Sequence, residues 1–280
     1  MILNPFSYQA PETLEEAISL LSNTENALLS GDQSQIDDAK KGKISGDSLV
    51  SLRKIDALKS IVHRENLVEI GSAVTFGAIL ADPAISSVSV LKEALQAIGD
   101  PHLRNHSNIG GAVYHNAPSH ASVLAALLAV DAQLNFSGAH GDSQIGIQNY
   151  LENYGATSFK KGEILKTIVF EKDKSSSGSF HYIDYLKSGK IVCGVALVVN
   201  KEHDVITKIR IAVSGCVRIP MRLTQVEQSL IGKEINRESV AEALKSLSGE
   251  ALEISNPFIA NPSYLFHLLK VLLKRAISKS

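Results

Sequence analysis

The sequence is poor in the residues that build metal clusters and disulfide frameworks. It has two cysteines, Cys193 and Cys216, two methionines and no tryptophan in 280 residues. Two thiols cannot by themselves ligate an iron–sulfur cluster or a four-thiolate zinc ion. So few cysteines also fit a reducing compartment rather than a disulfide-rich secreted protein. Both lie in predicted strands, where a small core residue is the simplest interpretation.

The chain also lacks a strong net charge and a long apolar run. Its formal net charge is −1 and its pI is about 6.8, so no basic field would attract a nucleic-acid backbone. The longest apolar run, Ala121–Val130, is about half of a membrane span. The first residues show no charged segment followed by an apolar one, so no secretory signal is visible. We therefore expect a cytoplasmic protein that binds neither nucleic acid nor membrane.

The signature motifs of several enzyme classes are missing as well. The sequence has no phosphate-binding P-loop, no dinucleotide-binding glycine turn after a strand, no serine-hydrolase elbow and no zinc-protease helix. A metal site could be built only from four histidines that prolines and glycines separate, so solvated loop histidines are the simpler interpretation. We predict no metal site and no catalytic residue. The four histidines are His102, His106, His115 and His120.

What is present is the composition of an ordinary folded chain, with 44% apolar and 20% charged residues. At about 150 residues per domain, the length suggests two folding units. The segment 172–178, with three consecutive serines, is typical of a linker. Both parts mix helical and strand patterns, so the predicted fold class is α+β.

The pattern before the linker begins with a helix over 12–23, which Thr13 can cap and which has Glu16 three residues on. The stretch 104–120 is too rich in glycine and asparagine for a regular element, and a helix that is apolar on most sides follows at 119–130. Strands are predicted at 49–52, 60–63, 66–71, 132–137, 143–147 and 163–170, and further helices at 75–81 and 88–98.

After the linker the pattern predicts an antiparallel sheet with helices on one face. A hairpin turn at Lys201-Glu202-His203-Asp204 connects the last two strands. The strands are predicted at 179–186, 192–200 and 205–214, and the helices at 223–231, 236–246 and 262–277.

Two glycine-containing turns are the remaining candidates for a ligand-binding site. They are Ser30-Gly31-Asp32-Gln33-Ser34 and Asn108-Ile109-Gly110-Gly111. Consecutive backbone N–H groups in such turns can form an anion-binding nest, and glycine lets the backbone approach a ligand closely. A diphosphate would suit such a nest, although a Gly–Gly turn by itself is more often structural.

Each of these two turns lies within a longer stretch that is close to a known sequence pattern. Asp100-Pro-His-Leu-Arg-Asn-His-Ser-Asn-Ile-Gly-Gly111 is close to D-P-x-I-R-N-x-G-T-I-G-G, and Leu28-Leu-Ser-Gly-Asp-Gln-Ser34 falls at L-A-G-G-x-S. In these motifs, and over nearly its whole length, the chain resembles the FAD-binding medium subunits of the molybdenum hydroxylases, the xanthine dehydrogenase and carbon monoxide dehydrogenase group.

The resemblance implies a two-part, PCMH-type FAD-binding domain at 1–171, with subdomains of about 1–57 and 58–171, and a C-terminal flavoprotein domain at 179–280. It implies FAD as the cofactor, electron transfer as the role, and two partners: a small [2Fe–2S] subunit and a large molybdopterin subunit. Ile191 would face the isoalloxazine ring. The residues that the resemblance assigns to FAD are Leu29, Ser30, Gly31, Asp32, Gln33, Ser34, Asn108, Ile109, Gly110, Gly111 and Ile191.

Four departures from the family pattern bear on the same ligand. Asp32 stands at the second glycine of the first loop, and the polar stretch 35–43 replaces an apolar run. Pro118-Ser-His-Ala121 lacks the carboxylate of P-x-x-D, and Ser188-Gly-Lys-Ile-Val192 lacks an aspartate. Two hypotheses follow: an FAD-carrying electron-transfer subunit, or a non-flavin structural subunit that keeps the fold.

Overall fold

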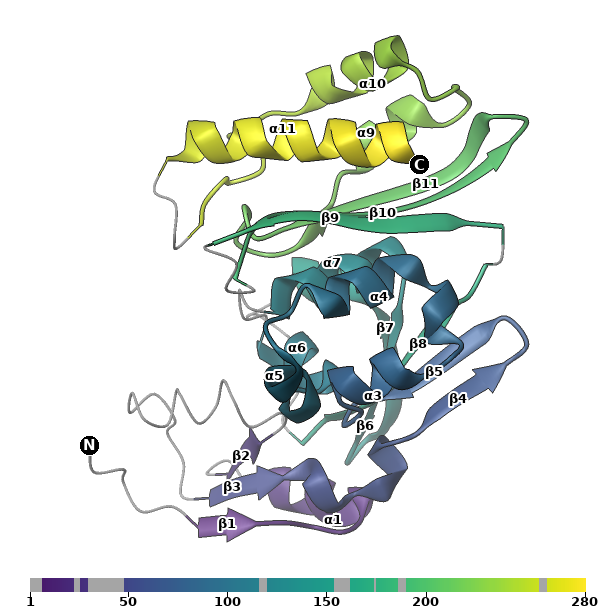
Figure 1. The fold of residues 1–280 in the computed structure, drawn as a ribbon. Coiled ribbons are helices and arrows are strands. Elements are labelled where there is room, and N and C mark those ends of the chain that lie inside the picture. Colours follow the sequence, from purple (N-terminus) through teal and green to yellow (C-terminus); the bar gives the residue numbers. More distant parts are fainter. Residues whose placement is uncertain are drawn as a thin grey trace. The chain divides into compact units, whose positions relative to one another are not determined.

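The computed structural model describes residues 7–22, 26–29, 48–115, 120–153, 162–173, 175–185, 190–256 and 261–280. The chain forms two compact units (Figure 1). Unit 1 comprises residues 1–79, 101–117 and 132–170, and unit 2 comprises 80–100, 118–131 and 171–280. The predicted division into 1–171 and 179–280 stays a prediction about sequence domains, because segments on both sides of it pack together in unit 2.

Unit 1 begins with a small parallel sheet against one helix. Strands β1 (Ser7–Gln9), β3 (Ser48–Ser51) and β2 (Asn26–Leu29) lie in that order. Helix α1 (Leu14–Leu21) buries Ala17 and Leu21 in a core shared with these strands. The predicted cap is confirmed, because the Thr13 hydroxyl accepts from the Glu16 N–H at 3.2 Å. The Glu16 carboxylate accepts from the Glu12 N–H, one residue before the position of a regular capping box.

The rest of unit 1 is a five-stranded sheet with short helices. Its order is β4 (Ile61–Arg64), β5 (Leu67–Gly71), β8 (Ile164–Glu171), β6 (Gln133–Gly138) and β7 (Gly141–Gly146). Helices α5 (Pro101–His106), α6 (Ile109–His115) and α8 (Ile147–Glu152) belong to the same unit, and α3 (Phe76–Ala81) follows β5.

The prediction of irregular structure over 104–120 is wrong where the structure describes this stretch, because α5 and α6 occupy most of it. Asn108 supplies the missing helix signal, since its side-chain oxygen accepts from the Gly111 N–H at 2.7 Å as an N-cap does. Buried packing of Ile109 and Val113 then outweighs the low helix propensity of the two glycines.

Unit 2 contains a four-stranded antiparallel sheet, in the order β12 (Met221–Arg222), β11 (Val205–Ser214), β10 (Ile191–Glu202) and β9 (Ser177–Asp184). The predicted hairpin turn between β10 and β11 is confirmed. His203 and Asp204 both have positive φ, 49° and 67°, which is the backbone of a two-residue type I′ turn.

Helices cover both faces of this sheet, so the prediction of helices on one face is wrong. Helices α9 (Thr224–Leu230), α10 (Arg237–Ala243) and α11 (Pro262–Lys279) lie on one side, and α4 (Ser89–Gln96) and α7 (Ala121–Ala129) on the other (Figure 1). All nine residues of α7 are buried. A helix without a polar face needs cover on every side, and the sheet supplies part of it.

Side chains of α4 close the outer edge of β9. The Glu93 carboxylate accepts from the Phe180 N–H at 2.7 Å, and the Ser89 hydroxyl donates to the Gly178 carbonyl at 2.5 Å. Both backbone groups would otherwise form part of an open strand edge, which is a template for unwanted pairing. The two bonds therefore tie a segment from before the linker to the sheet.

We expect Glu93→Ala to lower the free energy of unfolding by about 1–3 kcal/mol, because the Phe180 N–H loses a charged acceptor. Glu93→Gln is the matched control, since its amide oxygen can still accept that bond. Urea unfolding of both variants measures the difference. Equal stability of the two would mean that this hydrogen bond contributes nothing.

Candidate functional site

The second predicted loop, Asn108 to Gly111, forms the start of α6 and is held inside unit 1. Asn108 makes an isolated β-bridge with Thr75. Ile109, Gly110 and Gly111 are buried. The segment is therefore positioned by the connection between β5 and α3 rather than by solvent-exposed turn geometry.

Its backbone N–H groups are already used. The Ile109 N–H donates to the Val74 carbonyl at 3.1 Å, the Gly110 N–H to the Ser72 carbonyl at 2.8 Å, and the Gly111 N–H to the Asn108 side chain at 2.7 Å. The expectation that these three N–H groups form an anion nest is wrong, because each has a partner within the protein. Contact between this segment and a ligand through other groups stays a prediction.

Gly110 is required by packing. A Cβ atom at this position would lie 2.7 Å from the Ser72 carbonyl oxygen and 2.8 Å from the Ser72 Cβ. Both distances are shorter than non-bonded carbon contacts allow, so only glycine permits the two segments to approach this closely. The sequence pointed to the right glycine, but the group that it approaches is protein backbone.

Two serine hydroxyls beside this segment are buried without a hydrogen-bond partner. Ser72 and Ser107 are each 1% exposed, and among the described residues neither hydroxyl has a donor or acceptor within reach. Buried hydroxyls are normally paired. Ser48 and Ser214 are buried and unpaired in the same way, so an unpaired hydroxyl does not by itself mark a ligand contact.

The first predicted loop falls almost entirely outside the described residues. Leu29 is its one described member and ends β2 as a buried residue. Residues 30–34, with Asp32, and the polar stretch 35–43 lie outside the described part of the chain. Ala121, at the family's aspartate position, is the first residue of α7 and is buried. It offers no carboxylate to a ligand.

Ile191 belongs to unit 2 and begins β10. Its side chain is fully buried. The amide of Asn256 donates to the Gly215 carbonyl at 2.8 Å and to the Val192 carbonyl at 3.3 Å, which holds the backbone beside Ile191. A ring contact by Ile191 would need its protein neighbours to move, so that role stays a prediction. No sequence motif pointed to Asn256.

The cysteines behave as core residues. Cys193 and Cys216 are buried, with their Sγ atoms 3.4 Å apart. Hydrogen bonding to Cys216, together with burial, raises the pKa of the Cys193 thiol well above its ordinary value. A thiol that resists deprotonation is a poor nucleophile and a poor metal ligand.

The remaining histidines, cysteines and acidic residues are the possible metal ligands of the described ranges. Among the described residues, no group of three His, Cys, Asp or Glu side chains could hold a metal ion. His102 and His106 lie one turn apart on α5, exposed, with ring centroids 4.4 Å apart. Within the same described ranges, no helix is both long and apolar enough to cross a membrane.

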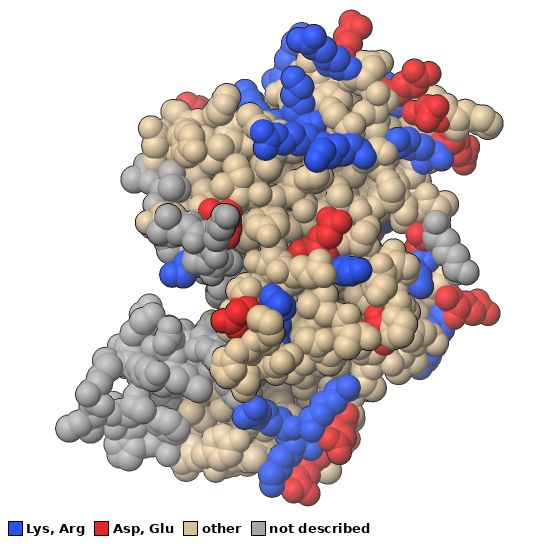
Figure 2. All heavy atoms as spheres, viewed as in Figure 1, with Lys and Arg blue, Asp and Glu red and all other residues tan. Residues whose placement is uncertain are grey.

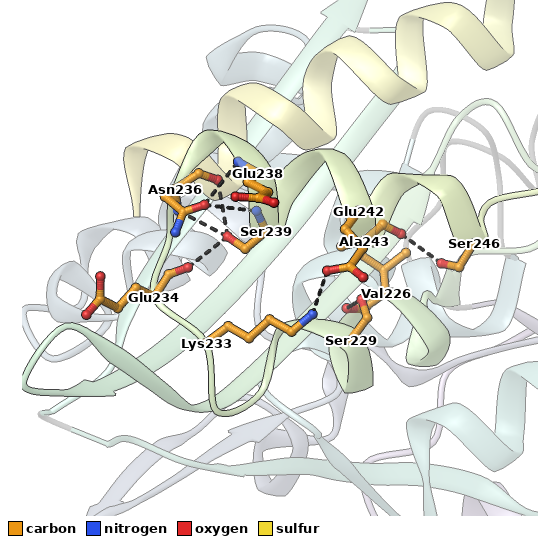
Figure 3. A network of polar contacts seen from close by, with 10 residues as sticks. All are labelled: Val226, Ser229, Lys233, Glu234, Asn236, Glu238, Ser239, Glu242, Ala243 and Ser246. Carbon is orange, nitrogen blue, oxygen red and sulfur yellow. Dashed lines mark hydrogen bonds and ion pairs between the residues drawn. The ribbon is translucent and has the colours of Figure 1, made fainter.

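An open depression of about 330 Å³ lies beside the start of α10. Its polar groups bind one another (Figure 3). The Asn236 side chain accepts from the Ser239 N–H at 2.9 Å, and the Ser239 hydroxyl donates to the Glu234 carbonyl at 2.7 Å. Lys233 pairs with Glu242 at 2.9 Å. The network is a helix cap with an exposed ion pair, and it explains the local fold without a ligand.

The charge of unit 2 is unevenly distributed. Helix α11 carries four cations and no acid between Pro262 and Lys279. Figure 2 shows blue side chains gathered over this helix. Its opposite side is apolar and is buried in the core that this helix shares with β10 and β11. The four cations are Lys270, Lys274, Arg275 and Lys279.

Comparison with known proteins identifies the family. Residues 4–170 match the family described as "FAD binding domain in molybdopterin dehydrogenase", and residues 190–280 match the "CO dehydrogenase flavoprotein C-terminal domain". The glyceraldehyde dehydrogenase medium chain of Sulfolobus acidocaldarius is 27% identical over 247 residues, 88% of each chain. The carbon monoxide dehydrogenase medium chain of Hydrogenophaga pseudoflava is 26% identical, over 87% of this chain and 86% of its own.

The fold is also similar to that of a solved structure. The carbon monoxide dehydrogenase of Hydrogenophaga pseudoflava that lacks the Mo-pyranopterin moiety has a TM-score of 0.92 at 23% identity, covering 99% of this chain and 97% of that one. The predicted α+β fold class and the predicted FAD cofactor are thereby confirmed at the level of the family. The chain therefore belongs to the FAD-binding-domain family of the molybdopterin dehydrogenases.

Proposed function

We propose that this protein is the FAD-carrying electron-transfer subunit of a molybdenum-containing hydroxylase. In this proposal a small partner subunit supplies electrons from [2Fe–2S] clusters, and a large partner holds the molybdopterin. The observation that carries the proposal is that family models match both parts of the chain, 4–170 and 190–280. Two curated relatives are named medium chains, which fits a multi-subunit assembly. We place the complex in the cytoplasm, in keeping with two free thiols.

The work of the chain itself would be to bind and orient the flavin. FAD, when bound, supplies the electron-accepting chemistry, and the protein supplies position and electrostatics. We propose the segments Leu29–Ser34 and Asn108–Gly111 as contacts of an FAD-binding domain at 1–171, and Ile191 as a contact from the domain at 179–280. The iron–sulfur clusters would reside on a partner, because two buried cysteines cannot hold one.

The rival hypothesis is a structural subunit without flavin. It is favoured by the hydrogen bonds that occupy the N–H groups of Ile109, Gly110 and Gly111. It is also favoured by Ala121, which brings no carboxylate to the ribityl hydroxyls. Under this hypothesis the segment 108–111 would bind no ligand, and its glycines would serve only the close packing of α6 against Ser72.

We expect Asp32→Gly to tighten FAD binding about ten-fold, because it removes a negative charge close to a diphosphate. Adding Ala121→Asp should tighten binding further, since that carboxylate would serve the ribityl end of the ligand. Fluorescence titration of FAD into wild type, the single variant and the double variant measures both steps. An unchanged dissociation constant in Asp32→Gly would show that this carboxylate points away from the ligand.

The proposed role is tested in the assembled complex. The small subunit, with its clusters chemically reduced, is mixed anaerobically with the FAD-loaded chain and the large subunit. The flavin absorbance should bleach as the cluster spectrum returns to its oxidised form. Persistence of both spectra, in a complex that gel filtration shows to be assembled, would contradict electron transfer to this subunit.

A further inference from the structure

Two histidines lie on one face of helix α5. His102 and His106 are four residues apart, both are exposed, and their ring centroids are 4.4 Å apart. Residues four apart on a helix project from the same face, one turn above the other. No glycine or proline separates them, so the interpretation as solvated loop histidines is wrong for this pair. The helix instead presents two imidazoles side by side to solvent.

The ring of His106 is oriented by the backbone. Its Nδ1 atom lies 2.9 Å from the His102 carbonyl oxygen. Because a carbonyl only accepts hydrogen bonds, Nδ1 carries the hydrogen, and Nε2 of the neutral ring keeps its lone pair. A histidine that ligates a metal ion is usually fixed in this way, with its other ring nitrogen bonded to a backbone carbonyl or a carboxylate. Nε2 of His106 is therefore available as a ligand in the protein as it stands.

The separation of the two rings suits one shared ion. A metal ion about 2.0–2.1 Å from an imidazole nitrogen lies about 3.2 Å from the ring centroid. Two centroids 4.4 Å apart can then subtend about 90° at that ion, the angle between neighbouring ligands in square-planar or octahedral coordination. The nearby cation Arg104 is two residues from each histidine, so it projects from another side of the helix and does not face the pair.

We propose that His102 and His106 form a surface site for a divalent late transition-metal ion, with Cu²⁺ held most tightly. Imidazole nitrogen suits copper, nickel and zinc, and a given nitrogen site generally binds Cu²⁺ more strongly than the other divalent ions of the first row. Water fills the remaining coordination positions, because no third His, Cys, Asp or Glu of the described ranges completes a metal-binding group.

This site is separate from the flavin chemistry of the family. The pattern to which this chain is similar, D-P-x-I-R-N-x-G, leaves the positions of both histidines unspecified. The metal site is thus a property of this chain's own residues, and the inference does not rest on the proposed function.

The test is a calorimetric titration of Cu²⁺ into the full-length, tag-free chain, in a buffer that does not chelate metals. Wild type should bind one Cu²⁺ at this site. His102→Ala and His106→Ala should each bind it about ten-fold more weakly or worse, because one imidazole alone cannot chelate the ion. Electron paramagnetic resonance should show two coupled nitrogen ligands in copper-loaded wild type and one in either variant.

His267→Ala is the matched control. His267 is exposed on α11 and has no second histidine within four residues, so its loss should leave the affinity for Cu²⁺ unchanged. Circular dichroism of the three metal-free variants should match wild type, because the substituted side chains are exposed. Absence of binding in wild type, or wild-type affinity in both His102→Ala and His106→Ala, overturns the inference. An equal loss in His267→Ala also overturns it, because single histidines would then hold the ion.

Discussion

Gly110→Val is expected to lower the free energy of unfolding by about 3 kcal/mol or more and to abolish flavin binding. The valine Cβ would lie 2.7 Å from the Ser72 carbonyl oxygen, and its methyl groups would add to that overlap. The backbone of Ser72 cannot retreat easily, because its N–H is bonded to the Lys166 carbonyl. The start of α6 must therefore move away from β5, and the Gly110–Ser72 hydrogen bond breaks.

Gly146→Ala is the control for this prediction. A Cβ at Gly146 would meet only the Gln133 side chain, at 3.5 Å, which is an ordinary contact. Gly146 also has a φ of −66°, which any residue adopts. Urea unfolding and flavin content should leave this variant close to wild type. Wild-type stability in Gly110→Val would contradict the packing role of the glycine.

Glu227→Ala is expected to destabilise unit 2 by about 3–5 kcal/mol, because it leaves a charge without its partner. Glu227 is 4% exposed. Its carboxylate receives the Arg222 guanidinium at 2.5 and 3.0 Å and the Ile211 N–H at 2.8 Å. The three contacts join β12, α9 and β11. Burial lowers the pKa of Arg222, but the Glu227 carboxylate outweighs it and the net shift is upward, so the arginine stays charged.

Two further variants separate the buried charge from the lost packing. Glu242→Ala breaks the exposed pair with Lys233 and should change stability little, since exposed ion pairs contribute little. Replacing Arg222 and Glu227 together by leucine should recover part of the loss, because no unpaired charge remains. Chemical denaturation of all three variants tests this ordering. A Glu227→Ala protein as stable as Glu242→Ala would contradict it.

The sequence could predict those parts of the fold that local patterns determine. The strand at 132–137 follows from its alternation, the strands at 192–200 and 205–214 from runs that alternate or are β-branched, and the Thr13 cap from its spacing to Glu16. The start of α6 could not be predicted in this way. Its backbone N–H groups are paired with the carbonyls of Ser72 and Val74, more than thirty residues earlier in the chain.

The same limit applies to the candidate site. The apolar pattern of α7 showed that it needs cover on all sides, but it could not show that the cover is a sheet beginning near residue 177. Gly110 and Gly111 indicated that another group approaches the backbone closely at this point. The sequence could not show that this group is Ser72 of the same chain.

The central claim is that this chain carries FAD. The most direct measurement is the flavin content of the purified full-length chain after incubation with excess FAD and removal of the unbound cofactor. Protein and flavin are quantified separately, and circular dichroism establishes that the chain is folded. The account predicts close to one FAD per chain. A folded chain that retains no flavin would contradict it and would favour the structural subunit instead.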